Sequence, residues 1–196
     1  VGDLYALAGE VAAARERLIE TLKRRATERP ENPELTVAEA RIGTGLAPAL
    51  ADALLGEMSD VEIRVTGAGV SLPDANEVPP ELENEARETL ERLRAAGMEP
   101  PTLEPTPALR LLIKRGEAVD LGGRMFGASE AAEAVMQAII AGCRADGEIS
   151  LSGLRDRLKT SRKYAQAWLE YADAAGITRR VGDVRVLTRR YRQAMD

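Results

Sequence analysis

The chain has 196 residues, 44% hydrophobic but only 3% aromatic, so several small aliphatic modules fit this composition better than one large core. Histidine is absent and there is one cysteine, which excludes Ser-His and Cys-His catalysis, most zinc ligand sets and an internal disulfide. No apolar run approaches the roughly 20 residues of a membrane span. We expect a soluble, cytoplasmic, non-enzymatic part of a longer protein, because the chain begins at Val1 and a single cysteine suits a reducing compartment.

Charge is distributed unevenly along the chain. The net charge is −5, with −5 over residues 1–75 and −3 over residues 76–128. Residues 129–196 carry +3, and the segment from Arg155 to Arg192 holds 11 basic and 4 acidic residues. This local excess of +7 predicts a cationic surface at one end of an otherwise acidic protein.

The first predicted module contains three helices and a hairpin. Apolar residues at helical spacing predict a helix over residues 8–28. Thr36 and Glu39 form a capping box for a second helix, and Pro48 suits the first turn of a third. Alternating apolar residues around a Gly-Ala-Gly turn predict a hairpin over residues 61–72. We expect the apolar face of the third helix to consist of Leu50, Leu54, Leu55 and Met58.

The middle module follows the same plan with one element missing. A helix is predicted from Pro80 to Gly97, and another, containing Leu109 and Leu112, ends at Gly116. Four prolines occupy the stretch between these helices, where a second helix is not expected. The Glu-rich run within residues 81–91 predicts an exposed helix face stabilised by ion pairs rather than a paired-carboxylate active site.

The last module has the most informative pattern. Ser129 is expected to cap its first helix, in which Cys143 is a small buried hydrophobic residue rather than a reactive thiol. A third helix begins at Ser161, and a strand, a turn at Gly182 and a second strand follow. We expect the apolar stripe of the third helix to consist of Ala165, Trp168, Leu169 and Ala172.

Internal similarity supports this organisation. The segments at 35–41 and 149–155 share a pattern 114 residues apart, and the match continues through the hairpins. The predicted fold is mainly α with small β-hairpins, as tandem winged-helix domains in an elongated array with few contacts between modules. We expect modules at residues 1–74, 75–128 and 129–196.

The residues Thr160-Ser161-Arg162-Lys163-Tyr164-Ala165, with Gly176-Ile177-Thr178-Arg179-Arg180 and the strand after Gly182, carry a resemblance. This string resembles the C-terminal winged-helix region of the bacterial selenocysteine-specific translation elongation factor. The resemblance is close over residues 148–187 and looser over residues 110–121. It departs from the family around Gln166, Ala167 and Trp168. Residues 1–75 match mainly by architecture.

The resemblance implies a role in selenocysteine incorporation. The last module would bind an mRNA hairpin beside the UGA codon, so that selenocysteinyl-tRNA is delivered to the ribosome. GTP and Mg are expected only for a separate GTPase portion, since this chain has no GxxxxGK[ST] motif. We expect a monomer with no metal and no catalytic residues in this part. The candidate RNA-binding residues are Ser161, Arg162, Lys163, Tyr164, Arg179, Arg180 and Arg185.

Several alternatives remain open at this stage. Tyr164 could stack on an RNA base or pack in the core, as its apolar repeat partner Leu50 suggests. Basic residues such as Arg155, Arg157 and Lys159 could simply be solvated, and the arginines after residue 188 could form a flexible tail. The whole chain could instead be a winged-helix DNA-binding regulator or a protein-interaction scaffold.

Overall fold

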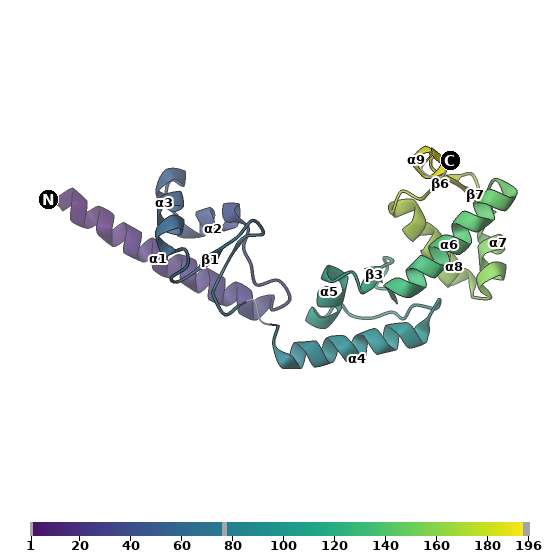
Figure 1. Cartoon of the computed structure of the whole chain (residues 1–196), viewed down its shortest axis with the longest axis horizontal. Coiled ribbons are helices and arrows are strands. Elements are labelled where there is room, and N and C mark those ends of the chain that lie inside the picture. Colours follow the sequence, from purple (N-terminus) through teal and green to yellow (C-terminus); the bar gives the residue numbers. More distant parts are fainter. Residues whose placement is uncertain (1, 76–77, 194–196) are drawn as a thin grey trace. The chain divides into compact units, whose positions relative to one another are not determined.

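The structure, a computed structural model, describes residues 2–75 and 78–193. The predicted module ends at residues 1 and 196 lie outside the described residues, as do linker residues 76–77. The chain divides into two compact units, Val1–Glu83 and Asn84–Asp196 (Figure 1). The division falls in the first turn of a helix, and the second unit contains almost all of the predicted middle module together with the last one.

The first unit has the predicted order of three helices and a hairpin. Thr36 caps the second helix with both hydrogen bonds of the capping box, and Gly45 ends it in the left-handed conformation. Pro48 is the first residue of the third helix, as predicted. The elements are α1 (Gly2–Glu28), α2 (Val37–Thr44), α3 (Pro48–Met58), β1 (Arg64–Val65) and β2 (Val70–Ser71).

One prediction for the apolar face of α3 is wrong. Leu54, Leu55 and Met58 are buried, but Leu50 is 41% exposed. Ala51 takes the buried position instead, because it lies one turn before Leu55 on the same side of the helix. An apolar side chain in a helical pattern therefore need not face the core when its neighbour fills that position.

The second unit contains the two remaining sets of predicted elements. The stretch between its first two helices has no helix, as its prolines predicted. The elements are α4 (Pro80–Ala96), α5 (Pro107–Lys114), β3 (Ala118–Asp120), β4 (Phe126–Ala128), α6 (Ser129–Asp146), β5 (Ile149–Ser150), α7 (Leu151–Leu158), α8 (Arg162–Ala174), β6 (Thr178–Val181), β7 (Val184–Leu187) and α9 (Arg189–Gln193). Helices α6, α7 and α8 pack against one another (Figure 1).

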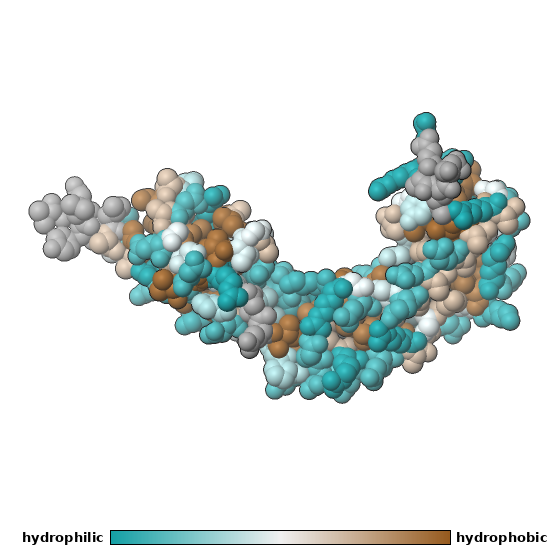
Figure 2. Space-filling model, in the orientation of Figure 1, coloured by the Kyte–Doolittle hydropathy of each residue, from teal (hydrophilic) through white to brown (hydrophobic). Residues whose placement is uncertain are grey.

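Two surface features bear on earlier expectations. The glutamates of the run within residues 81–91 are exposed, and hydrophilic residues cover most of the visible face of α4 (Figure 2). The prediction that Ser129 caps α6 is wrong: Ala128 is at the N-cap position, Ser129 is the first residue of the helix, and its hydroxyl donates to the carbonyl of Gly116 at 2.6 Å. Within residues 2–75 and 78–193, no helix is both long and apolar enough to cross a bilayer.

Trp168 of α8 joins the last winged helix to the segment before it. Its indole N–H donates to the carbonyl of Met98 at 2.9 Å, and its ring lies so close to Gly127 that a Cβ there would meet it at 3.0 Å. Leu121 belongs to the same buried cluster as Trp168. The expectation of few contacts between modules is therefore wrong in this unit, because the largest side chain of α8 is buried against residues of the middle module.

The shared core generates a prediction about the isolated last module. A fragment of residues 129–196 loses the acceptor of the Trp168 N–H and part of its apolar surroundings. We expect it to be about 1–3 kcal/mol less stable to urea than a fragment of residues 78–196, which keeps both. Tryptophan fluorescence measures both the unfolding of each fragment and the surroundings of Trp168, since Trp168 is the chain's single tryptophan. Equal stability and equal emission maxima in the two fragments would show that the contact contributes nothing.

Candidate nucleic-acid interface

The C-terminal wing is a three-stranded antiparallel sheet in the order β5-β7-β6. Arg180 of β6 pairs with Arg185 of β7, and Thr178 pairs with Leu187, so these four side chains share one face. Because Leu187 is in the core, this is the face turned toward the helices. Arg179 pairs with Val186 and lies on the opposite face.

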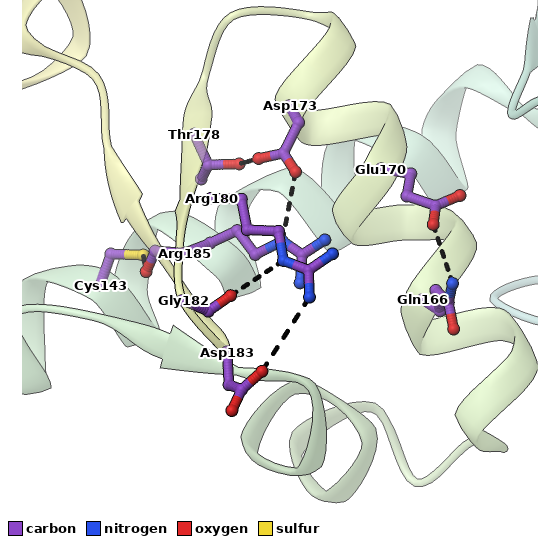
Figure 3. Close-up of polar contacts among 9 residues, drawn as sticks. All are labelled: Cys143, Gln166, Glu170, Asp173, Thr178, Arg180, Gly182, Asp183 and Arg185. Atoms are coloured by element: carbon purple, nitrogen blue, oxygen red, sulfur yellow. Dashed lines mark hydrogen bonds and ion pairs between the residues drawn. The ribbon is translucent and has the colours of Figure 1, made fainter.

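Helix α8 brings a second group of polar side chains to the same region. Ser161 occupies its N-cap position without a side-chain capping bond, and Arg162 begins the helix. Arg162 and Gln166 are four residues apart and therefore lie on one side of α8. Gln166 also donates to Glu170 at 2.8 Å, one turn further along (Figure 3).

The wing and α8 form a polar pocket together with the start of α7. The pocket has a volume of about 540 Å³. Three arginines, one each from α8, β6 and β7, line it together with hydroxyl and amide groups, which gives it the composition of an anion site. It is lined by Ser150, Leu151, Ser152, Arg162, Gln166, Arg180, Asp183 and Arg185.

The two wing arginines are held differently (Figure 3). Arg185 is only 7% exposed, and its Nε–H donates to Oδ2 of Asp173 at 3.2 Å. Thr178 donates its hydroxyl to the other oxygen of Asp173 at 2.7 Å. Arg180 is exposed; its Nε–H donates to the carbonyl of Gly182 at 2.9 Å, and Asp183 lies 4.0 Å from its guanidinium. Arg185 is thus fixed by an ion pair, whereas Arg180 is tethered mainly to the turn.

The structure brings together three of the seven predicted site residues. Arg162, Arg180 and Arg185 line the pocket, while Arg179 lies on the other face of the wing. The Lys163 ammonium lies over the Tyr164 ring, 5.3 Å from its centroid, so these two side chains form a separate pair.

The surroundings of Tyr164 weaken the core-packing alternative. Its side chain is half-buried and is absent from the buried cluster around Trp168. Its repeat partner Leu50 is itself exposed, so the repeat no longer argues for a core position. Tyr164 remains available for stacking.

Sequence reasoning missed two serines of the pocket and the carboxylate that holds Arg185. Ser150 is the N-cap of α7, and its position in the repeat matches the capping residue Thr36. Ser152 follows two residues later. Asp173 carried no local signal, because its contacts with Thr178 and Arg185 depend on how α8 packs on the wing.

The other basic residues of this region have separate roles. Arg155 and Arg157 are exposed and paired with Asp156 and Asp146, which fits solvated positions. The last arginines form α9 rather than a flexible tail, because Tyr191 packs against the core.

Cys143 is buried, as predicted. Burial raises the pKa of its thiol above the ordinary value, which disfavours the reactive thiolate. Its S–H lies 3.7 Å from the carbonyl oxygen of Arg185, so Cys143 packs beneath the wing.

Unit 1 has the same architecture without this pocket chemistry. At the repeat distance of 114 residues, Arg162, Arg180 and Arg185 correspond to Pro48, Thr66 and Ser71. A conserved topology thus carries different surfaces, and the cationic one lies in the last module.

Part of that module is similar to a known family in its sequence. Residues 143–187 match the family model described as the winged helix of elongation factor SelB. Residues 143–187 are therefore similar to a SelB winged helix. This confirms the resemblance found in the same segment, and the match includes Arg162, Arg180 and Arg185. No curated protein matches the chain.

Two solved structures are similar to the chain. One is the mRNA-binding domain of elongation factor SelB from E. coli in complex with SECIS RNA, with a TM-score of 0.45 and 22% identity over 55% of this chain and 98% of that one. The other is the bacterial selenocysteine-specific elongation factor EF-Sec, with a TM-score of 0.50 and 18% identity. The match covers 90% of this chain but only 30% of EF-Sec, and at this identity it shows the fold alone.

The burial of Arg185 predicts different stability effects within the pocket. Arg185→Gln leaves the partly exposed Asp173 carboxylate without its cation and should cost about 2 kcal/mol of unfolding free energy, as expected for a hydrogen bond between charged groups. Arg162→Gln and Arg180→Gln change exposed side chains and should stay within about 0.5 kcal/mol of the unsubstituted protein. Urea denaturation followed by Trp168 fluorescence measures all three. A cost for Arg162→Gln as large as that for Arg185→Gln would contradict this distinction.

Proposed function

We propose that the last module binds the phosphate backbone of an mRNA hairpin. The observation that carries this proposal is the pocket in which Arg162 of α8 meets Arg180 and Arg185 of the wing, inside the segment that matches SelB. Guanidinium groups donate paired hydrogen bonds to phosphate oxygens, and a pocket with three of them favours a polyanion. The acidic balance of the rest of the chain confines that attraction to one surface.

The shape of RNA favours this kind of contact. The major groove of an A-form helix is too narrow for a recognition helix, so proteins contact the backbone and the splayed bases of loops. The pocket fits a backbone contact because its cations come from both the helix and the wing. Tyr164, half-buried and outside the core cluster, supplies an aromatic face for an unstacked loop base.

The finer role in translation belongs to the same proposal. The module would hold a selenoprotein mRNA beside its UGA codon while selenocysteinyl-tRNA is delivered to the ribosome in the cytoplasm. A GTPase portion of the factor would carry GTP and Mg, and this chain would act as a monomer without catalytic residues, metal or cofactor of its own. This role is supported by the match of residues 143–187 to a translation elongation factor.

Salt dependence tests the backbone contact. If the three pocket arginines neutralise three phosphates, the logarithm of the affinity should fall with the logarithm of salt concentration at a slope of about −2.1 to −2.7. Arg162→Gln with Arg180→Gln should reduce that magnitude by about 1.4–1.8. The matched control is Arg155→Gln with Arg157→Gln, which removes two arginines that already have carboxylate partners. The measurement is fluorescence anisotropy of the full chain with the E. coli SECIS hairpin and other hairpins that flank selenocysteine codons.

Three outcomes of that titration would contradict the proposal. Equal slope changes in the pocket and control variants would remove the pocket from the interface. Tighter binding to a duplex DNA of equal length would favour the regulator alternative. No binding to any nucleic acid by folded protein would favour the scaffold alternative.

Loop substitutions test whether the hairpin is recognised beyond its phosphates. Changing one loop base should cost about 1–3 kcal/mol, by analogy with base-edge contacts, and should leave the salt slope nearly unchanged. A stem base-pair reversal that preserves the A-form shape is the control. If loop changes have no effect while the slope is as steep as expected, the module binds RNA backbone without decoding a particular message.

A further inference from the structure

Asp173 occupies a position that helix physics disfavours. It lies in the last turn of α8, where the helix dipole repels negative charge, and Asp has low helix propensity in its own right. Its side chain points to the wing, where both carboxylate oxygens are used. Oδ1 accepts from Thr178 at 2.7 Å and Oδ2 accepts from Arg185 at 3.2 Å (Figure 3).

Arg185 has little freedom at its backbone or along its stem. It lies on β7, the central strand, paired with Ile149 on one side and Arg180 on the other. Its carbonyl accepts the Cys143 S–H, and the residue is 7% exposed. The remaining freedom is the orientation of the guanidinium, and its Nε–H is the edge that Asp173 holds.

Without Asp173, the inward orientation of the Arg185 guanidinium would be unfavourable, because the nearest charge on the same face is another cation. Arg180 and Arg185 lie directly opposite each other on the same face, where like charges destabilise a sheet. The exposed carboxylate of Asp183 lies 4.0 Å from Arg180 and does not contact Arg185. Asp173 is the carboxylate that compensates the buried arginine among the described residues, and a buried charge without such a partner is strongly unfavourable.

We propose that Asp173, oriented by Thr178, is a positioning residue for RNA binding. It takes the Nε edge of Arg185 and leaves the two terminal Nη groups for a phosphate in the pocket that Arg185 lines. This inference rests on the proposed function. It adds that the negative charge of Asp173 strengthens RNA binding although it lies beside an anion site. The reason is that fixing the orientation of the Arg185 guanidinium outweighs the repulsion between Asp173 and the phosphate.

A positioning role and a purely electrostatic role predict changes of opposite sign in RNA affinity when Asp173 loses its charge. Asp173→Asn keeps the size of the side chain and a carbonyl oxygen that can accept from Thr178, but it removes one negative charge. Electrostatics alone would tighten RNA binding, whereas loss of positioning weakens it. We expect about tenfold weaker binding of the full chain to the tightest-binding hairpin of the titration above, equal to about 1.4 kcal/mol.

Asp183→Asn is the matched control. It also removes one carboxylate from the pocket region, and Asp183 is exposed with no contact to Arg185. We expect this variant to bind the hairpin more tightly. If Asp173→Asn also tightens binding, Asp173 is only a local negative charge and the inference is overturned.

A double-mutant cycle shows whether Asp173 acts through Arg185. Asp173→Asn should weaken binding in the unsubstituted protein but add nothing further once Arg185→Gln is present. Independent, multiplied losses would overturn the proposal. Thr178→Val covers the case in which Asp173→Asn does not fold, because it removes one hydrogen bond to Asp173 without changing charge. It should weaken binding by about threefold, and unchanged binding in a folded variant counts against the proposal.

The outcomes also separate this inference from the function on which it rests. If the unsubstituted protein binds no hairpin, both fail. If it binds, and Arg162→Gln and Arg185→Gln weaken binding while Asp173→Asn behaves as Asp183→Asn does, the function stands and the positioning role alone fails. Urea denaturation with Trp168 fluorescence confirms that each variant is folded at the temperature of the titration.

Discussion

The burial of Trp168 is the constraint on which the second unit depends. Its side chain is completely buried, and its N–H finds an acceptor only because the chain around Met98 passes beside α8. Gly127 allows the close approach, since a Cβ would meet the ring at 3.0 Å. One aromatic residue therefore fixes α8 on one side against the middle module. At its two ends, α8 carries residues that face the wing: Arg162 lines the pocket at the first, and Asp173 pairs with Arg185 at the second.

A polar pair then determines how the wing lies on that helix. Side chains alternate between the two faces of a strand, so Arg185 on the central strand faces inward, as Leu187 does two residues later. Leu187 is apolar and suits the core, whereas Arg185 is charged. An inward-facing arginine requires a partner, and Asp173 at the end of α8 supplies it. The pair connects strand and helix at the edge of the core. The same arginine lines the pocket, so the contact that supports the wing also shapes the candidate interface.

The internal repeat shows that two modules of one chain can share a fold and present different surfaces. Unit 1 and the last module share three helices followed by a hairpin, with capping residues Thr36 and Ser150 at equivalent places. The side chains that would contact a ligand are not shared, since the pocket arginines correspond to neutral residues in unit 1. Winged-helix topology in this protein is therefore a scaffold, and the charge of each surface sets what it can bind.

The sequence by itself determined most of the helices and turns, because these depend on local chemistry. The capping box at Thr36, the proline that starts α3 and the glycine at 45 act within a few residues, and the basic segment after Arg155 was visible as a count of charges.

The sequence by itself did not determine the contacts between distant residues. Leu50 fits an apolar stripe but is exposed, and Ser129 resembles a cap but donates to Gly116, because each outcome depends on which neighbour lies nearby in space. The tertiary structure alone decided that Arg162, Arg180 and Arg185 meet while Arg179 does not, since strand register sets the face of each side chain. It also decided that Asp173, without any local signal, is the partner of the buried arginine.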